Sequence, residues 1–443
     1  MTRPEQTNRR TFLRHAGAAA SAPFFIKNLI SAPPSSTLRL ASFGADGMAW
    51  VTLDQIARHP AVKLACVADV DSSHFNKVKA KYPEAKTYED WRRLLESEHK
   101  AIDIVCVATP DHMHAPISMT AMRLGLPVYC QKPLTHDIYE ARRLTETARK
   151  KKLVTQMGIQ RHSSAEYRLA VQLIQSGAIG KVKEVHSWSM KKWGDPEPMP
   201  DRSDPVPPSL NWDHWLGTAA TRPYLKGYYH PINWRKRIDF GTATFGDMGC
   251  HIYDPVFSSL ELRSAISVRS EGPPPTQHNW AINSVIHYVF PGTPFTAEKQ
   301  VRVTWYDGDE RPPQEIQALV APAKVPGQGS IFIGTKGVML LPHTGQVALY
   351  PEDRYRDFAM PQVEDLNHYF QFVDAVLGKG QTSAPFHYSG PLTEAVLLGP
   401  LATRFPKTTL EWHSRSMKFK NSNEANAYVR RQYRAGWEVK GLS

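Results

Sequence analysis

The chain has 443 residues, of which 41% are hydrophobic, so it can bury large cores and we expect two globular domains. Its formal charge of +12 would suit a nucleic-acid partner, but the basic residues are spread along the chain and form no nucleic-acid-binding motif, so we expect none. The four cysteines are too few for a disulfide framework and form no Cys-x-x-Cys motif, so we expect no metal ligands.

Residues 1–36 have the pattern of an export signal followed by a linker. Arg9 and Arg10 precede Phe12, Leu13 and an alanine-rich, weakly apolar stretch, which resembles a twin-arginine signal. A disordered basic tail is the alternative. Signals of this type serve proteins that fold before export, which suits an enzyme that loads a cytoplasmic cofactor, so we expect a periplasmic protein. No run of about 18 apolar residues follows, so we expect no membrane anchor.

Residues 37–160 alternate between short apolar runs and amphipathic segments. The apolar runs cover residues 38–43, 63–71, 101–110, 127–130 and 153–160, and the helical patterns cover residues 51–58, 74–81, 88–96, 115–124 and 137–150. Strands that alternate with helices in this way predict a parallel, doubly wound sheet with a Rossmann arrangement, in an α/β fold. We therefore expect a nucleotide-binding domain here.

The turn after the first apolar run reads GADGMA and resembles an imperfect dinucleotide fingerprint. Asp46 stands where a glycine is usual, so either its side chain points away and Gly47 allows the close backbone approach, or the loop has lost dinucleotide binding. Asp69 follows Gly44 by 25 residues, where an acid binds the adenosine ribose and disfavours a 2′-phosphate. We therefore expect NAD to contact Gly44, Asp46, Gly47, Met48 and Asp69.

The third, fourth and fifth apolar runs are each followed by polar residues. Ligands of doubly wound sheets bind at the carboxyl ends of the strands, so we expect these segments to complete the cofactor site. The residues concerned are Thr109, Pro110, His112, His114, Gln131, Lys132 and Gln160. His112 and His114 could instead bind a metal, but no third ligand has a suitable spacing, and simple turn polarity is the remaining alternative.

From residue 161 to residue 385 the pattern changes to strand-like runs separated by turns, which predicts a substrate-binding α/β domain with a largely antiparallel sheet. The runs cover residues 182–190, 281–290, 299–306, 330–333, 337–341 and 346–350. Six prolines between Pro196 and Pro208 predict a stiff loop, which is either a subunit-packing arm or a lid. We expect residues 386–443 to form a C-terminal helix and an arm that pack on the second domain.

Asp247 and His251 lie four residues apart in FGDMGCHIYD, which we expect to be helical. They share a face, so Asp247 can orient the His251 imidazole, and Lys132 meets both only across a cleft between the domains. The lysine can stabilise alkoxide charge beside a cofactor, and His251 suits a general base because it titrates near neutrality. The alternatives are a surface lysine that caps a turn and a solvent-facing polar stripe.

Aromatic and polar residues cluster just before this helix, at Trp212, Trp215, Tyr228, Tyr229, His230, Trp234 and Arg235. Aromatic faces stack on sugar rings, and His230 or Arg235 could bind hydroxyls or a carboxylate; packing in the core or at an interface is the alternative. The expected substrate-binding residues are Arg161, His162, Tyr229, His230, Trp234 and Arg235.

Several segments together resemble the Gfo/Idh/MocA family of nucleotide-dependent oxidoreductases, from residue 38 to the end of the chain. They read VADVD, VATPDHMHA, CQKPLTHDIYEAR, QMGIQRH and WRKRIDFGTATFGDMGCHIYD. The resemblance implies an N-terminal Rossmann domain, an open-faced α/β domain whose sheet often mediates dimers or tetramers, and a sugar, sugar acid or cyclitol substrate. It places the family's catalytic lysine, aspartate and histidine at Lys132, Asp247 and His251. Gln131 departs from the family, which usually has glutamate there.

The resulting hypothesis is an exported, homo-oligomeric, NAD(H)-dependent oxidoreductase acting on a hydroxyl or keto group of a carbohydrate, sugar acid or cyclitol. Two alternatives stay open. One is an NAD-dependent glycosidase that oxidises the sugar transiently, eliminates the glycosidic substituent and returns the hydride. The other is a non-catalytic sugar-binding relative, suggested by Asp46 and Gln131.

Overall fold

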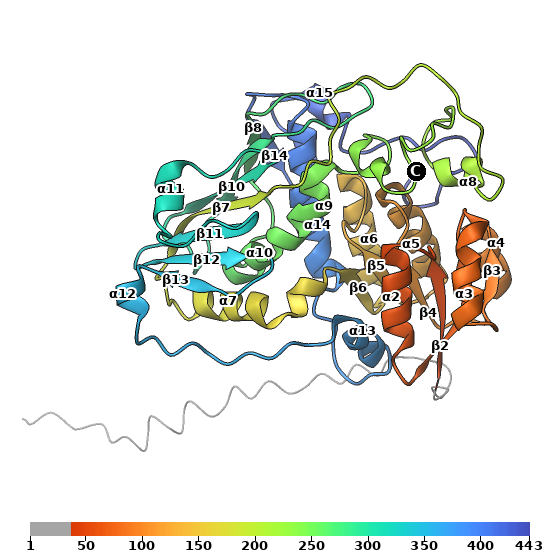
Figure 1. The fold of residues 1–443 in the computed structure, drawn as a ribbon, viewed down its shortest axis with the longest axis horizontal. Coiled ribbons are helices and arrows are strands. Elements are labelled where there is room, and N and C mark those ends of the chain that lie inside the picture. Colours follow the sequence, from red (N-terminus) through yellow and green to blue (C-terminus); the bar gives the residue numbers. More distant parts are fainter. Residues whose placement is uncertain (1–36) are drawn as a thin grey trace, which may run out of the picture. The chain divides into compact units, whose positions relative to one another are not determined.

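The computed structural model describes residues 37–443, which form two sheets of six and nine strands with helices around them (Figure 1). The predicted α/β fold, with a parallel Rossmann sheet and a mostly antiparallel second sheet, is confirmed. The expected export signal lies outside the described residues. Among residues 37–443, no helix is both long enough and apolar enough to cross a membrane.

The first sheet is parallel throughout and has the strand order β3-β2-β1-β4-β5-β6. Its strands are β1 (Leu38–Phe43), β2 (Val62–Ala68), β3 (Lys86–Tyr88), β4 (Ile104–Val107), β5 (Val128–Gln131) and β6 (Thr155–Gly158). Its helices are α2 (Met48–Ala57), α3 (Phe75–Lys81), α4 (Trp91–Glu98), α5 (His114–Arg123) and α6 (Ile138–Lys151). The short edge strand β3 was not among the predicted runs, because three residues carry too little pattern to be recognised.

The second sheet has the order β13-β12-β11-β7-β10-β9-β8-β14-β15. Its strands are β7 (Val182–Ser189), β8 (Ser267–Ser270), β9 (Val285–Pro291), β10 (Gln300–Asp307), β11 (Gln328–Gly334), β12 (Val338–Pro342), β13 (Ala348–Tyr350), β14 (Leu410–His413) and β15 (Lys418–Phe419). Within the described residues, β7 and β10 are the one parallel pair of this sheet. The runs that form β8, β14 and β15 were not predicted.

The remaining helices follow β6 in the chain. They are α7 (Ala165–Gln175), α8 (Trp212–Leu216), α9 (Ala243–Ile252), α10 (Asp254–Leu260), α11 (Gln314–Ala318), α12 (Glu352–Tyr355), α13 (His368–Val376), α14 (Phe386–Ala402) and α15 (Asn423–Asn426). Helix α14 is almost wholly buried and contacts both α6 and α9 (Figure 1). It therefore joins the two halves into one hydrophobic core.

The C-terminal segment contacts both halves of the protein, not only the second domain as expected. Strands β14 and β15 extend the second sheet. Beyond them, Arg431 donates to the buried Glu140 of α6 at 2.8 Å, and Arg143 donates to the Gly441 carbonyl at 3.1 Å. A buried carboxylate needs a charged partner, so the tail is held against α6 by the ionic contact of Glu140.

Residues 190–242 cross from β7 to the loop that follows β2. We call this stretch the crossing segment. Ser72 donates its backbone N–H to the Ser209 carbonyl and Asn211 donates to the Val70 carbonyl, both at 2.8 Å. An aromatic cluster around Trp215 and Tyr229 packs beneath these contacts. The crossing segment is therefore tied to the carboxyl end of the first sheet, where the sequence predicted the cofactor.

Candidate active site

Lys132 stands immediately after β5, and its ammonium group points to helix α9 of the second half. Nζ donates to the Asp247 carboxylate at 2.5 Å and to the Asp247 backbone carbonyl at 2.7 Å. The lysine side chain is 13% exposed, so the pair is largely shielded from water. Two of the three ammonium hydrogens are thereby committed, and the third is left for another acceptor.

Asp247 is the charge centre of the site. Besides Lys132, its carboxylate accepts from Trp193 Nε1 at 2.8 Å, from Lys191 Nζ at 3.2 Å and from Arg235 Nε at 3.4 Å. Burial by itself would raise the pKa of Asp247, but the adjacent cations outweigh burial and lower it well below its usual range. Asp247 is therefore a permanent anion that holds three cationic side chains in one place.

The two glycines in the middle of α9 leave no room for a Cβ. A Cβ added at Gly246 would lie 1.9 Å from Thr242 Oγ1, and one added at Gly249 would lie 2.4 Å from the Phe245 ring. Both positions therefore contact protein rather than a ligand. The packing buries Asp247, so the solvent-facing stripe considered above is excluded.

His251 does not pair with Asp247 as the helical spacing predicted. Among residues 37–443 no hydrogen bond joins the two, because the Asp247 oxygens face Lys132, Lys191, Trp193 and Arg235. The His251 ring lies 5.5 Å from the His343 ring, and its Nδ1 has no hydrogen-bond partner among the described residues. Burial, followed by the Lys132 charge, lowers the pKa of His251 well below its usual value. His251 is therefore a neutral imidazole near neutral pH, and the expectation that it titrates there is wrong.

The turn after β1 has the features that a bound dinucleotide needs. Gly44 has φ +101°, and a Cβ there would lie 2.7 Å from the Ala49 Cβ and 3.0 Å from the Ala108 carbonyl oxygen. Gly47 caps α2 without a side-chain hydrogen bond, and within the described chain the Gly47 and Met48 amides donate to no other group. Free amides at a helix N-terminus bind phosphate. The buried Thr109 hydroxyl is also unpaired among residues 37–443.

Asp46 and Asp69 are both held by neighbouring residues. The Asp46 carboxylate lies 3.5 Å from Lys77 Nζ, so its charge is offset by that lysine. Asp69 accepts from the Ala45 amide at 2.8 Å and from the Asp71 amide at 2.9 Å, which places it beside the turn after β1. These positions fit an NAD cradle: the turn for the pyrophosphate and Asp69 for the ribose hydroxyls.

The structure corrects the expected cofactor contacts of His112 and His114. Both side chains are fully buried; His112 Nε2 lies 3.0 Å from the Trp215 carbonyl, and His114 contacts the Pro133 and Thr109 carbonyls, each at 2.7 Å. Burial lowers the pKa of His112 to about 3 and that of His114 to about 4. These histidines therefore fix the loops around Lys132 and do not face a ligand.

Two further residues of the expected cofactor set also make internal contacts. Gln131 is buried and donates to Thr52 Oγ1 of α2 at 2.9 Å, and a Cβ at Gly158 would lie 2.7 Å from its amide carbon. Gln160 Nε2 donates to the Tyr129 hydroxyl at 3.4 Å. Met48 is half exposed at the start of α2, and Pro110 precedes the short helix η2 (Asp111–Met113). Gln131 therefore joins β5, β6 and α2 through packing and one hydrogen bond.

The structure does not bring all the expected substrate-binding residues together in one place. Arg235 reaches Asp247 and therefore belongs to the site. The Trp234 ring centroid lies 4.2 Å from the Arg235 guanidinium, but Trp234 itself is buried in the aromatic cluster. Arg161 is partly exposed and lies 3.5 Å from Glu166.

Three others lie elsewhere. Tyr229 is 1% exposed within the aromatic cluster, so it is a packing residue. His162 is committed to the buried Asp254 at 2.8 Å, and His230 lies beside the loop after β2.

Sequence reasoning missed Lys191, Trp193 and His343. Lys191 and Trp193 directly follow β7, so the rule that strand ends carry ligand-binding residues could have indicated them. His343 lies in the turn after β12 and is hydrogen-bonded to Tyr167 at 2.8 Å. Nothing in the sequence around His343 points to α9, and only the packing of the second sheet brings it there.

Comparison with known proteins agrees with this arrangement. Residues 38–159 match the model of an oxidoreductase family with an NAD-binding Rossmann fold, and residues 173–291 match that family's C-terminal α/β domain. The Rossmann domain is thus NAD-binding.

Two curated relatives are dehydrogenases. The inositol 2-dehydrogenase of Corynebacterium glutamicum (strain R) is 28% identical over 150 residues, which cover 33% of this chain and 44% of that protein. The levoglucosan dehydrogenase of Pseudarthrobacter phenanthrenivorans is 27% identical over 149 residues, 32% of this chain and 37% of that protein. The match therefore spans less than half the length of either relative.

Solved structures share the fold over most of the chain. The WlbA dehydrogenase of Chromobacterium violaceum, in complex with NADH and UDP-GlcNAcA, has a TM-score of 0.61 at 15% identity and covers 87% of this chain and 99% of its own. GenD2 from gentamicin A biosynthesis, in complex with NAD, has a TM-score of 0.56 at 17% identity over 86% of this chain and 98% of its own. At these identities the likeness shows the fold.

Proposed function

The chain belongs to the Gfo/Idh/MocA oxidoreductase family, and on this premise we propose that it transfers a hydride between NAD and a hydroxyl or keto carbon of a carbohydrate, sugar acid or cyclitol. The observation that carries the proposal is the Lys132–Asp247 pair, which lies where the carboxyl end of β5 meets α9. A cation fixed beside an NAD cradle is the group that an alcohol–ketone interconversion needs.

Each residue of the site has a part in this chemistry. Bound NAD supplies the hydride acceptor or donor. The uncommitted ammonium hydrogen of Lys132 binds the reacting oxygen and stabilises its developing negative charge. Asp247 keeps Lys132 in place and stays ionised. His251 is the neutral base that takes the hydroxyl proton, since its lowered pKa leaves an imidazole nitrogen free to accept it.

The charges around Asp247 favour an acidic substrate within this class. Lys132, Lys191 and Arg235 all contact Asp247, which offsets one of their three charges. Oxidised nicotinamide adds a further positive charge when it is bound. A carboxylate or another anionic group on the sugar would compensate this excess, and Lys191 and Arg235 are the side chains placed to bind it.

The test uses the purified full-length chain. Denaturing it and identifying any released nucleotide shows whether NAD is carried, and NADH formation is then followed with a panel of neutral sugars, uronic acids and cyclitols. Released NAD together with glycoside cleavage and no net NADH would favour the glycosidase mechanism instead. Failure to bind NAD in either redox state would contradict the proposal and favour the non-catalytic relative.

Asp69 provides a test of the cofactor position. Replacing Asp69 by alanine should weaken NAD binding and relax the discrimination against NADP, because the carboxylate both binds the ribose hydroxyls and repels a 2′-phosphate. Isothermal titration with each nucleotide measures both effects. Unchanged affinities for both nucleotides would show that the ribose lies elsewhere.

We also propose export to the periplasm and assembly into a homo-oligomer. Replacing Arg9 and Arg10 by lysine should keep the protein in the cytoplasm, because the twin-arginine machinery reads the pair itself. Cell fractionation checks this, and unchanged periplasmic recovery would remove the export claim. Light scattering on the purified protein measures the subunit number, and a monomer at all concentrations would exclude assembly.

A further inference from the structure

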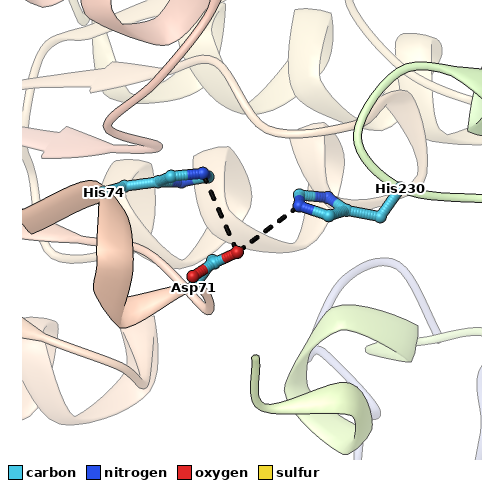
Figure 2. A group of neighbouring side chains, drawn as sticks. All are labelled: Asp71, His74 and His230. Carbon is cyan, nitrogen blue, oxygen red and sulfur yellow. Dashed lines mark ion pairs between the residues drawn. The ribbon is translucent and has the colours of Figure 1, made fainter. Parts of the chain in front are cut away.

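Asp71, His74 and His230 converge just after the end of β2 (Figure 2). Asp71 and His74 belong to the loop and the short helix η1 (Ser72–His74) that follow β2. His230 comes from the crossing segment. Their ligand atoms all lie within 4.8 Å of one another. Two segments far apart in the sequence thus present one carboxylate and two imidazoles to the same space.

Asp71 forms ion pairs with both histidines, and the distances between these atoms also suit a shared ion. Asp71 Oδ2 lies 3.5 Å from His230 Nε2 and 3.9 Å from His74 Nε2. A tetrahedral zinc site with bonds of about 2.0–2.1 Å separates its ligand atoms by about 3.4 Å, so small movements would complete it. The other oxygen, Oδ1, already accepts from the Ser73 hydroxyl at 2.6 Å and amide at 3.1 Å, which turns Oδ2 toward the histidines.

A second carboxylate supports His74 from behind. His74 Nδ1 lies 3.2 Å from Asp69 Oδ2, which is an ion-pair distance. Metal-binding histidines commonly place their other ring nitrogen on a carboxylate, which fixes the tautomer and leaves the facing nitrogen free to bind. Here that arrangement leaves Nε2 of His74 facing Asp71.

The backbone already holds the two segments together. The Ser72–Ser209 and Asn211–Val70 hydrogen bonds fix the loop after β2 against the crossing segment. Asp71 is 8% exposed, whereas the His74 and His230 side chains are each 20% exposed. The site is therefore prearranged, and one side remains open for an ion to enter.

We propose that Asp71, His74 and His230 form a binding site for a divalent transition-metal ion, with water or a ligand oxygen as the fourth donor. Two imidazoles and one carboxylate suit zinc best among the common ions. The ion would fasten the crossing segment, which also carries Arg235, to the nucleotide-binding half. The sequence led us to expect no metal ligands, because it contains no Cys-x-x-Cys motif and no third ligand suitably spaced from His112 and His114. The group described here escapes such patterns, because His230 lies far along the chain from Asp71 and His74.

In the experiment, the chelator-treated full-length chain is titrated with zinc and, separately, with cobalt. Calorimetry and visible absorption measure the binding. One tight equivalent is expected, with the cobalt absorption of a tetrahedral site bearing nitrogen and oxygen ligands. His230→Gln should abolish the site, and Asp69→Asn should weaken binding by about 10–100-fold. His413→Gln replaces an exposed histidine outside the group and should change neither the metal affinity nor the cobalt absorption.

Two results would overturn the proposal. One is the absence of a stoichiometric site in the wild-type chain, which would leave a network of direct histidine–aspartate ion pairs. The other is metal binding that survives His230→Gln, which would place the ion elsewhere. Circular dichroism of each variant verifies folding, and the wild-type titration decides the question even where a variant misfolds.

Discussion

Replacing Asp247 by asparagine removes the one negative charge that three cations share. The four-residue spacing of Asp247 and His251 in α9 by itself predicts that Asp247→Asn lowers the rate less than His251→Ala does. The structure reverses that order, because the Asp247 carboxylate holds Lys132 and does not contact His251. An asparagine keeps the size of the side chain and one acceptor oxygen. The effect therefore reports the loss of charge.

The magnitude follows from burial. Breaking a fully buried pair by removing one partner costs about 3–5 kcal/mol. Asp247 is 6% exposed and Lys132 is 13% exposed, but Lys191 is 41% exposed and can turn its charge to water. We therefore expect a loss of about 2–4 kcal/mol in the free energy of unfolding. Displacing the preorganised lysine should also lower kcat by about 10²-fold or more.

The adjacent pair Lys192–Asp309 provides a matched control. It joins the same two residue types at 2.7 Å, but Asp309 is 67% exposed. Because water screens an exposed ion pair, Asp309→Asn should cost much less stability than Asp247→Asn and leave the rate unchanged. Urea unfolding and steady-state kinetics on the substrate found in the panel measure both variants. If Asp247→Asn cost no more than Asp309→Asn in either assay, the charge-centre role of Asp247 would be refuted.

Three further outcomes are expected. Gly44→Ala should destabilise the protein by about 2–4 kcal/mol and weaken NAD binding, because φ is positive and the new Cβ meets Ala49 and the Ala108 carbonyl. Gly47→Ala also has a positive φ, but its Cβ meets nothing within 4 Å, so it should cost less, and equal losses would contradict this reasoning. His251→Gln should lower kcat/KM about 10²–10⁴-fold and remove an acid limb that lies well below pH 6.5 in the wild type; a limb at neutral pH would show that His251 is not the base. The folded-state pKa values of His112 and His114, about 3 and about 4, lie below the unfolded value, so only the unfolded chain takes up these protons as the pH falls. The free energy of unfolding should therefore be greatest above pH 6.5 and fall toward pH 4 by about 1.4 kcal/mol per pH unit for each histidine. A urea midpoint that stays constant between pH 6.5 and pH 5 would contradict this prediction.

Local pattern was sufficient for most of the fold. Alternating apolar runs and amphipathic segments predicted the Rossmann strands and helices except β3, and they indicated a second, mostly antiparallel sheet. Periodicity reports which face of an element is buried, so it succeeds where elements are regular and long enough. Strands β8, β14 and β15 were missed because short strands with one buried face resemble ordinary loops in sequence.

The motifs also predict that Lys132 and Asp247 lie close together, since they mark the carboxyl end of a strand and a helix in the facing half. Which atoms meet depends on how the chain packs. A spacing of four residues places Asp247 and His251 on one helical face, but the carboxylate turns to Lys132, Lys191 and Arg235, because a buried anion is most stable where its cationic partners are. Those partners come from separate strand ends and loops, and only the packing of the complete chain brings them together.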